Sequence, residues 1–180
     1  MRIKIIEVGP LRTNCYIITQ QGIGIIIDPG GEEDKIIKGV KDFKIKMILL
    51  THNHFDHIDA LVPVAKATGA LIAIHPLDSI NISFRELKDG ERLSFENRDI
   101  LVIHTPGHTP GSCCFYINGF LFSGDTIFAG GWGNTMFPGG NEEVLFDSIR
   151  NKIMNLPEET IIYPGHGENT ILGKEKPLYF

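Results

Sequence analysis

The sequence predicts a four-layer αββα sandwich of the mixed α/β (α+β) class, in which two mixed β-sheets pack face to face with helices outside. Three observations support this fold class. Short β-branched runs dominate the first third of the 180-residue chain. Each half contains strands as well as helical patterns, so each half is expected to form a sheet that helices cover. Loops that contain histidine or aspartate follow several apolar strands, which places a candidate site at the strand ends.

In the first half, β-branched runs bounded by turn residues predict strands, and apolar residues at helical spacing predict helices. Strands are expected at residues 3–8, 15–19, 24–27, 46–50 and 71–74. Helices are expected at residues 32–43 and 58–68, the second ending at Gly69, with a short helix after Pro76. Acidic residues in the first turn of the first helix favour its start there, because they interact well with the helix dipole.

The second half predicts four consecutive strands, a long helix and a last strand. The strands are expected at residues 92–95, 100–104, 112–117, 120–123 and 160–163. The helix is expected over residues 141–156, with Asn141 as its N-cap. The Ile, Leu, Val and Phe side chains inside these elements are interpreted as core.

Length and composition predict one domain over residues 1–180, large enough to bury a core without disulfides. A net charge of −5 offers no basic patch, so neither nucleic acid nor a membrane is an expected partner. The three cysteines, of which Cys113 and Cys114 are adjacent, do not resemble a secreted disulfide framework. Without a signal peptide or an 18-residue apolar run, the chain is expected in the cytoplasm.

The most informative segment is Thr51–His57, which contains three imidazoles and one carboxylate directly after an apolar strand. Imidazole nitrogen and carboxylate oxygen suit zinc, iron or manganese, and the lack of cysteine argues against a closed structural zinc site. In an extended stretch, His52 and His54 point to the same side and can bind one ion. Asp56 and His57 lie past the bend and can face a second ion.

Three further loops after strands contain one ionisable residue each, namely His108, Asp125 and His166, beside glycine or proline. A single such residue is usually a surface or capping residue. Four such loops together hold five of the seven histidines, however, and indicate one metal centre. The other two histidines, His75 and His104, are interpreted as structural or as supports for a ligand.

Six segments together resemble the metallo-β-lactamase superfamily and, within it, short single-domain relatives of glyoxalase II, the hydroxyacylglutathione hydrolases. They are residues 14–16, 28–30, 52–57, 105–112, 124–128 and 164–167. The resemblance implies the metallo-β-lactamase fold and two divalent metal ions, with zinc expected and iron or manganese as alternatives. It also implies three ligands for the first ion, three for the second and one bridging carboxylate: His52, His54 and His108; Asp56, His57 and His166; and Asp125.

Some features depart from the resembled family. Ala60 replaces a common glycine, and Asn134 and Met136 replace an arginine and an aspartate in a loop that lines the site, so the substrate preference stays open. The chain ends 14 residues after His166. We therefore expect no C-terminal glutathione-binding helical domain, and glutathione as the carrier is not implied.

The implied function is a metal-dependent, glyoxalase II-like hydrolysis of a small thioester or related ester, in which a hydroxide between two ions attacks the carbonyl. Asp56 is the expected catalytic residue, because it would orient this hydroxide as well as bind metal. Asp28 is interpreted either as a turn residue before Pro29 or as a support for a metal-binding histidine.

The sequence leaves four alternatives to this function. The first is a mononuclear iron persulfide dioxygenase on a similar scaffold, and the second is a metal-binding domain without turnover. A β-lactamase is disfavoured, since that branch resembles a different second-metal pattern and is usually exported. Catalysis by Cys113 or Cys114 is disfavoured because both lie in an apolar strand, where burial is expected.

Overall fold

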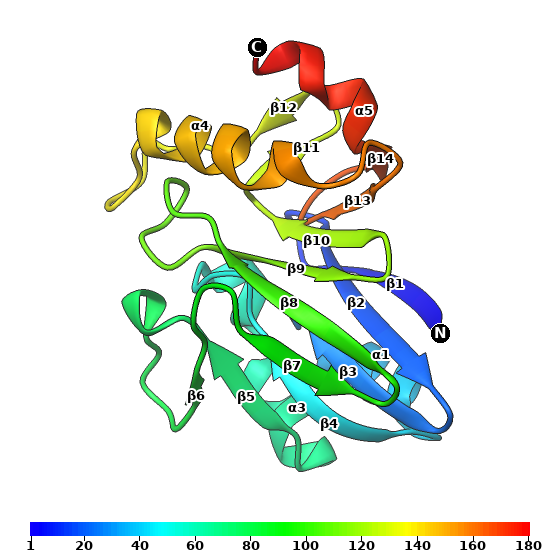
Figure 1. Cartoon of the computed structure of the whole chain (residues 1–180). Helices are drawn as coiled ribbons and strands as arrows, with labels where there is room; N and C mark the ends of the chain where they lie inside the picture. Colours follow the sequence, from blue (N-terminus) through cyan, green and yellow to red (C-terminus); the bar gives the residue numbers. More distant parts are fainter.

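Two six-stranded sheets pack face to face in the computed structural model, which describes residues 1–180 (Figure 1). The first sheet has the order β1 (Arg2–Val8), β2 (Thr13–Gln20), β3 (Ile23–Ile27), β4 (Lys44–Leu49), β5 (Leu71–Ile74) and β6 (Arg85–Glu86). The second has the order β14 (Thr170–Ile171), β13 (Ile161–Pro164), β10 (Phe120–Gly124), β9 (Cys113–Ile117), β8 (Arg98–His104) and β7 (Arg92–Phe95). A separate hairpin joins β11 (Ile127–Phe128) to β12 (Gly131–Trp132).

Both sheets are mixed, and their parallel pairs determine where the loops lie. In the first sheet β1, β2 and β3 are antiparallel, whereas β3, β4, β5 and β6 run parallel. In the second sheet β10 and β13 are parallel and the other neighbours are antiparallel. Parallel neighbours end at the same edge, so the loops after β3 and β4 lie together, as do those after β10 and β13.

Helices cover the two outer faces, which confirms the αββα sandwich (Figure 1). Helices α1 (Glu33–Val40) and α3 (Leu61–Thr68) pack on the first sheet through buried Ile36 and Val64. Helix α4 (Glu142–Asn151), the 3-10 turn Ile153–Asn155 and helix α5 (Leu172–Glu175) pack on the second sheet. A third apolar core, which includes Phe95, Phe115 and Phe122, fills the space between the sheets. No helix is long and apolar enough to cross a lipid bilayer.

The expected helix over residues 58–68 is wrong at its start. A short helix α2 (Phe55–Ile58) begins inside the histidine-rich segment, and α3 begins only at Leu61. The break lies at Ala60, whose backbone N–H donates to the Pro29 carbonyl at 3.0 Å instead of continuing one helix. The segment therefore changes from extended chain to helix between His54 and Asp56, so its candidate ligands project in two directions.

The long C-terminal helix is also shorter than expected. Asn141 is its N-cap, as predicted, because its side chain accepts a hydrogen bond from the Val144 N–H at 3.1 Å. The α-helix ends at Asn151, after which the chain continues as a 3-10 turn. Lys152 stands at this break, and its ammonium group donates to the His104 carbonyl at 2.7 Å, which ties the chain to β8. The sequence also failed to predict β6, β11, β12, β14 and α5, which have only two to four residues each.

Candidate metal centre

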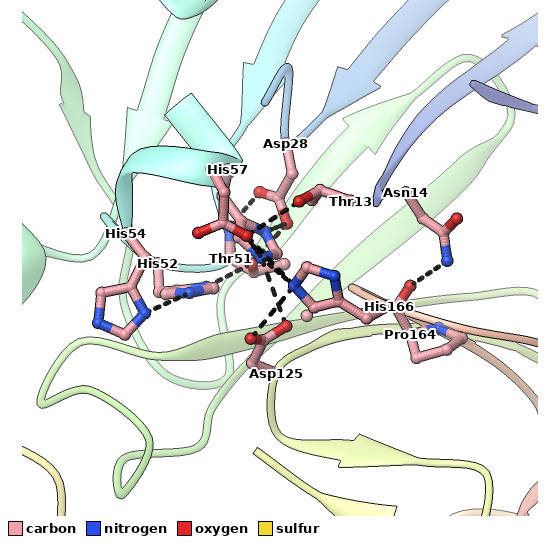
Figure 2. A network of polar contacts seen from close by, with 12 residues as sticks. Thr13, Asn14, Asp28, Thr51, His52, His54, His57, Asp125, Pro164 and His166 are labelled. Atoms are coloured by element: carbon pink, nitrogen blue, oxygen red, sulfur yellow. Dashed lines mark hydrogen bonds and ion pairs between the residues drawn. The ribbon is translucent and has the colours of Figure 1, made fainter. Parts of the chain in front are cut away.

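All seven residues that the sequence predicts as ligands converge at the sheet edge where the loops after β4, β8, β10 and β13 meet. Figure 2 shows five of them, His52, His54, His57, Asp125 and His166. Their candidate ligand atoms form three overlapping groups, within each of which all atoms lie within 4.8 Å of one another. The groups are His52, His54 and His108; His52, His57 and Asp125; and Asp56, His57 and His166. The first sheet supplies four of these side chains and the second sheet supplies three.

The first group consists of three imidazoles whose nitrogens face a common point. Nδ1 of His54 lies 3.1 Å from Nε2 of His52 and 2.9 Å from Nε2 of His108. The two Nε2 atoms of His52 and His108 are 3.3 Å apart. Tetrahedral zinc ligation at about 2.0–2.1 Å places neighbouring nitrogens about 3.3 Å apart, so this spacing fits one ion.

The group of Asp56, His57 and His166, called the second group from here on, combines two imidazoles with a carboxylate. The remaining group, His52, His57 and Asp125, connects it to the first. Nε2 of His166 lies 3.2 Å from Oδ2 of Asp56 and 3.4 Å from Nε2 of His57. Asp125 lies between the two groups, since its Oδ2 is 3.5 Å from Nε2 of His108 and 3.6 Å from Nε2 of His166. One carboxylate therefore borders both groups.

Hydrogen bonds on the outer side of the rings leave the inner nitrogens available to a metal ion once they are deprotonated. Nδ1–H of His108 donates to the Asn134 carbonyl at 2.7 Å, and Nδ1–H of His166 donates to the Leu11 carbonyl at 3.1 Å. Nδ1–H of His57 donates to Oδ2 of Asp28 at 2.9 Å. An imidazole that donates from one nitrogen presents the other as an acceptor, which is the form that binds a metal.

Thr51 and Asp28 form hydrogen bonds with the outer nitrogens of His52 and His57, respectively. The Thr51 hydroxyl donates to Asp28 at 2.6 Å, and so its oxygen accepts from Nδ1–H of His52 at 3.0 Å. Asp28 is buried, and besides His57 it accepts the Thr51 backbone N–H at 2.8 Å. Asp28 thus both turns the chain, with φ at 52°, and supports two histidines of the centre.

The electrostatics of the centre favour a cation. Burial alone would raise the pKa of Asp56, yet the hydrogen bond from His166 and the charge of His57 hold it below its usual value. Burial and the neighbouring imidazoles lower the pKa of His52, which keeps this ring neutral. Burial would lower the pKa of His57, but Asp125 and Asp28 outweigh it and raise that pKa to about 10. A metal ion has to displace this proton from His57, so we expect binding to strengthen as the pH rises.

Two buried side-chain oxygens lack a hydrogen-bond partner in the protein, namely Oγ1 of Thr160 and Oδ1 of Asp125, and the second belongs to the centre. Oδ1 of Asp125 makes no hydrogen bond, although Nε2 of His57 lies 3.4 Å away. Buried carboxylate oxygens are nearly always satisfied by a donor or a cation. The orphaned Asp125 oxygen, the inward ring nitrogens and the ligand spacing all fit bound metal.

The metallo-β-lactamase superfamily model matches residues 8–166 of the chain. The chain belongs to the metallo-β-lactamase superfamily. Together with the histidine and aspartate groups, this membership places the protein among the metallo-hydrolases with a candidate metal site.

Three superfamily relatives are similar over nearly their whole length. Hydroxyacylglutathione hydrolase GloC from Haemophilus influenzae is 33% identical, and the match covers 98% of this chain and 95% of that protein. The crystal structure of the BLEG-1 B3 metallo-β-lactamase has a TM-score of 0.90 at 34% identity, covering 98% of this chain and 97% of that one. The structure of TTHA1623 in a di-iron-bound form has a TM-score of 0.88 at 34% identity, covering 96% of each chain.

The two histidines outside the ligand groups of this metallo-β-lactamase domain stack on each other instead. The rings of His75 and His104 are 4.0 Å apart and inclined by only 9°. Nε2–H of His104 donates to the Pro110 carbonyl at 2.9 Å, and Nδ1 of His75 accepts the Leu77 N–H at 3.4 Å. Their structural interpretation agrees with these contacts, which join β5 to β8.

Both neighbouring cysteines of the metallo-β-lactamase domain are buried in β9. Burial raises the pKa of the Cys114 thiol to about 11 and raises that of Cys113 further. A catalytic cysteine needs a thiolate, and burial in apolar surroundings suppresses it. The structure therefore argues against cysteine catalysis.

Sequence reasoning missed Asp78, a buried carboxylate that joins two ligand loops. Its Oδ2 accepts the Asn53 N–H at 3.2 Å and the Thr109 hydroxyl at 2.6 Å, while its Oδ1 accepts the Gly111 N–H at 2.7 Å. Asn53 lies between two histidines of the first group, and Thr109 follows the third. Asp78 is thus a positioning residue for that group, and the one sequence signal is its place just after β5, in a 3-10 turn at the end of a parallel strand.

Asp78→Asn is expected to weaken metal binding about tenfold to a hundredfold, since groups that orient ligands contribute on that scale. An amide in place of the carboxylate makes its NH2 group face one of the hydrogen-bond donors that Asp78 now accepts from. One hydrogen bond is then lost, so the free energy of unfolding should fall by about 1–3 kcal/mol. Competition with a chromophoric chelator measures the affinity, and thermal melting measures stability. Asp99→Asn, on the exposed side of β8, is the matched control. Wild-type affinity in Asp78→Asn would contradict the positioning role.

Proposed function

We propose that the protein is a glyoxalase II-like metal-dependent hydrolase that cleaves a small thioester or related ester. The observation that supports this most strongly is the pair of ligand groups that share Asp125, within a chain similar to a hydroxyacylglutathione hydrolase. The seven side chains match the donor set of hard and borderline divalent metals, and zinc, iron and manganese are all compatible with it.

In this proposal His52, His54 and His108 hold a first ion, Asp56, His57 and His166 hold a second, and Asp125 contacts both. When bound, two divalent ions polarise a carbonyl oxygen and lower the pKa of water toward about 7. The protein itself supplies the orientation of the ligands and the exclusion of bulk water, because most of these side chains are buried.

Asp56 is the proposed catalytic residue. Its Oδ2 accepts the Thr13 hydroxyl at 2.9 Å, which fixes the carboxylate in one orientation. The hydrogen bond from His166 and the charge of His57 keep it ionised. A fixed, ionised carboxylate in the second group can accept a hydrogen bond from the attacking water and orient it toward the carbonyl carbon.

A second candidate function is hydrolysis of a β-lactam. The observation in its favour is the 34% identity to the protein named BLEG-1 B3 metallo-β-lactamase. An amide in a strained ring presents the same carbonyl chemistry to such a centre, so turnover of nitrocefin is measured beside turnover of thioesters.

Removal of metal is the decisive test of the proposed function. We expect dialysis against a chelator to lower thioester hydrolysis at least about a hundredfold, because the activated water is lost, and addition of zinc, iron or manganese to restore it. Elemental analysis gives the metal content per chain, and S-lactoylglutathione and simpler thioesters serve as substrates.

Several outcomes would contradict the proposal. Undiminished hydrolysis by metal-free protein would exclude a metal-dependent mechanism. One iron per chain with oxygen uptake on a persulfide would identify a dioxygenase instead. Failure of metal-loaded protein to hydrolyse any ester, thioester or β-lactam would identify a metal-binding domain without turnover.

A further inference from the structure

Three large apolar side chains are exposed on two segments that contain or contact residues of the first ligand group. Phe55 is 65% exposed, Met136 is 88% exposed and Phe137 is 53% exposed. We call them the apolar lip. Single exposed apolar residues are common on proteins, but a cluster at the rim of a polar centre marks a binding surface.

The apolar lip directly adjoins the candidate metal centre. The ring of Phe137 contacts the ring of His54 edge to face, with 5.4 Å between their centroids. Phe55 stands between His54 and Asp56 in the sequence, at the first turn of α2. A group bound at the centre on the His54 side therefore has Phe137 as its neighbour, and Met136 and Phe55 follow directly after Thr135 and His54 on the same segments.

Hydrogen bonds hold the loop of the lip in place. Asn134 accepts from His108 through its backbone carbonyl at 2.7 Å, and its side-chain oxygen accepts the Met136 N–H at 2.9 Å. The Phe137 carbonyl accepts the Gly140 N–H at 2.9 Å. Met136 and Phe137 are thus presented by a preformed turn that is tied to a residue of the centre, which lowers the entropic cost of binding.

The loops at this edge contain almost no positive charge. Residues 9–12, 28–32, 50–54, 105–112, 125–141 and 165–169 include one arginine or lysine, Arg12. Arg12 pairs with Glu7 at 2.9 Å and follows Leu11, whose carbonyl binds His166, so it lies on the side of the second group. A carboxylate or a strongly hydrated polar group on the substrate would find no cation among the lip residues.

We propose that the apolar lip binds the acyl group of the substrate and selects alkyl or aryl acyl groups over hydroxyacyl groups. This inference rests on the proposed thioester hydrolysis and names the class of its acyl substrate. The apolar surface of the acyl group is removed from water when it packs against Met136, Phe137 and Phe55, while the carbonyl lies at the metal centre. Loss of one such contact lowers selectivity by about tenfold.

The test compares two thioesters of one uncharged thiol, N-acetylcysteamine, that differ in the acyl group alone. Wild-type protein is expected to hydrolyse the phenylacetyl thioester with a kcat/KM at least about tenfold above that of the lactoyl thioester. Met136→Ser and Phe137→Ser should each lower this ratio about tenfold, mainly through a higher KM for the phenylacetyl thioester. Phe180→Ser, at an 81% exposed position at the C-terminus, should keep the wild-type ratio.

A binding measurement gives a readout that does not depend on turnover. A non-hydrolysable ketone analogue of the phenylacetyl thioester should bind the two lip variants about tenfold more weakly than wild-type protein in calorimetry. The metal content of the variants should equal that of the wild type, since neither side chain is a candidate ligand.

The possible failures are distinguishable. Hydrolysis of both thioesters without a phenylacetyl preference, or with an unchanged ratio in both lip variants, would overturn the inference and leave the proposed function standing. Hydrolysis of neither by metal-loaded protein would overturn the proposed function itself. A wild-type dimer that dissociates in the lip variants with an unchanged ratio would show that the lip is an interface between copies of this chain.

Discussion

Asp125→Asn is expected to abolish thioester hydrolysis and to lower the metal content of the purified protein. Asp125 borders both ligand groups, and its Oδ1 is buried without a hydrogen bond. An amide in its place keeps the shape but directs an NH2 group or a weaker acceptor toward the ions. Changes to groups that merely support a ligand lower affinity or activity about 10- to 100-fold, so loss of a shared ligand should exceed about 100-fold.

Elemental analysis after gel filtration measures the metal content of Asp125→Asn, and kcat/KM on one thioester measures its activity. The burial of Asp125 makes a stability check necessary, which thermal melting with and without added metal provides. Asp147→Asn, on the exposed face of α4, is the control for a lost carboxylate. Wild-type metal content and activity in Asp125→Asn would remove Asp125 from the centre.

Gly30→Ala is expected to destabilise the folded protein and to displace the second ligand group. An added Cβ would lie 1.7 Å from the backbone oxygen of Asp56 and 3.3 Å from Cα of His57. Both neighbours are backbone atoms of α2, so no flexible side chain can move aside. Overpacking of this kind costs about 1–3 kcal/mol or more, which lowers the melting temperature of a chain of this size by about 3–10 °C.

Thermal melting and metal titration together measure the effect of Gly30→Ala. Gly131→Ala is the matched control, because an added Cβ there meets no atom within 4 Å. If the Gly30→Ala protein melted and bound metal like the control, the close approach between Gly30 and α2 would not constrain the centre.

Much of the fold could be predicted from the spacing of apolar residues and from the turn residues that separate the runs. The strands that the structure confirms have four or more residues and a run of β-branched or apolar side chains, as in β2 and β3. The strand β14 and the helix α5 have two and four residues, so they contain no full period that a pattern could detect. Their position depends on tertiary contacts, such as the Gly130 N–H that donates to Glu175 at 2.8 Å.

In the candidate centre, too, some residues could be predicted from local sequence patterns, whereas others depend on tertiary contacts. Its seven candidate ligands could be predicted because histidine and aspartate stand at strand ends beside glycine and proline, and because the segments resemble a known family. Asp78 and Asn134 could not, since their effect arises from contacts between loops that are far apart in sequence. The start of α2 inside the histidine segment depends on the contact between Ala60 and Pro29, which no local pattern records.

The division of the centre between the two sheets couples metal binding to their assembly. The chain up to His57 contains four of the seven candidate ligands, and the other three appear only between His108 and His166. Neither half alone completes either ligand group of the proposed pair. A ligand that binds only the native state, at a free concentration 1,000 times its Kd, adds about 4 kcal/mol to the free energy of unfolding. An ion at this edge would therefore act as a cross-link between the two sheets, present only once the C-terminal half has docked on the N-terminal half.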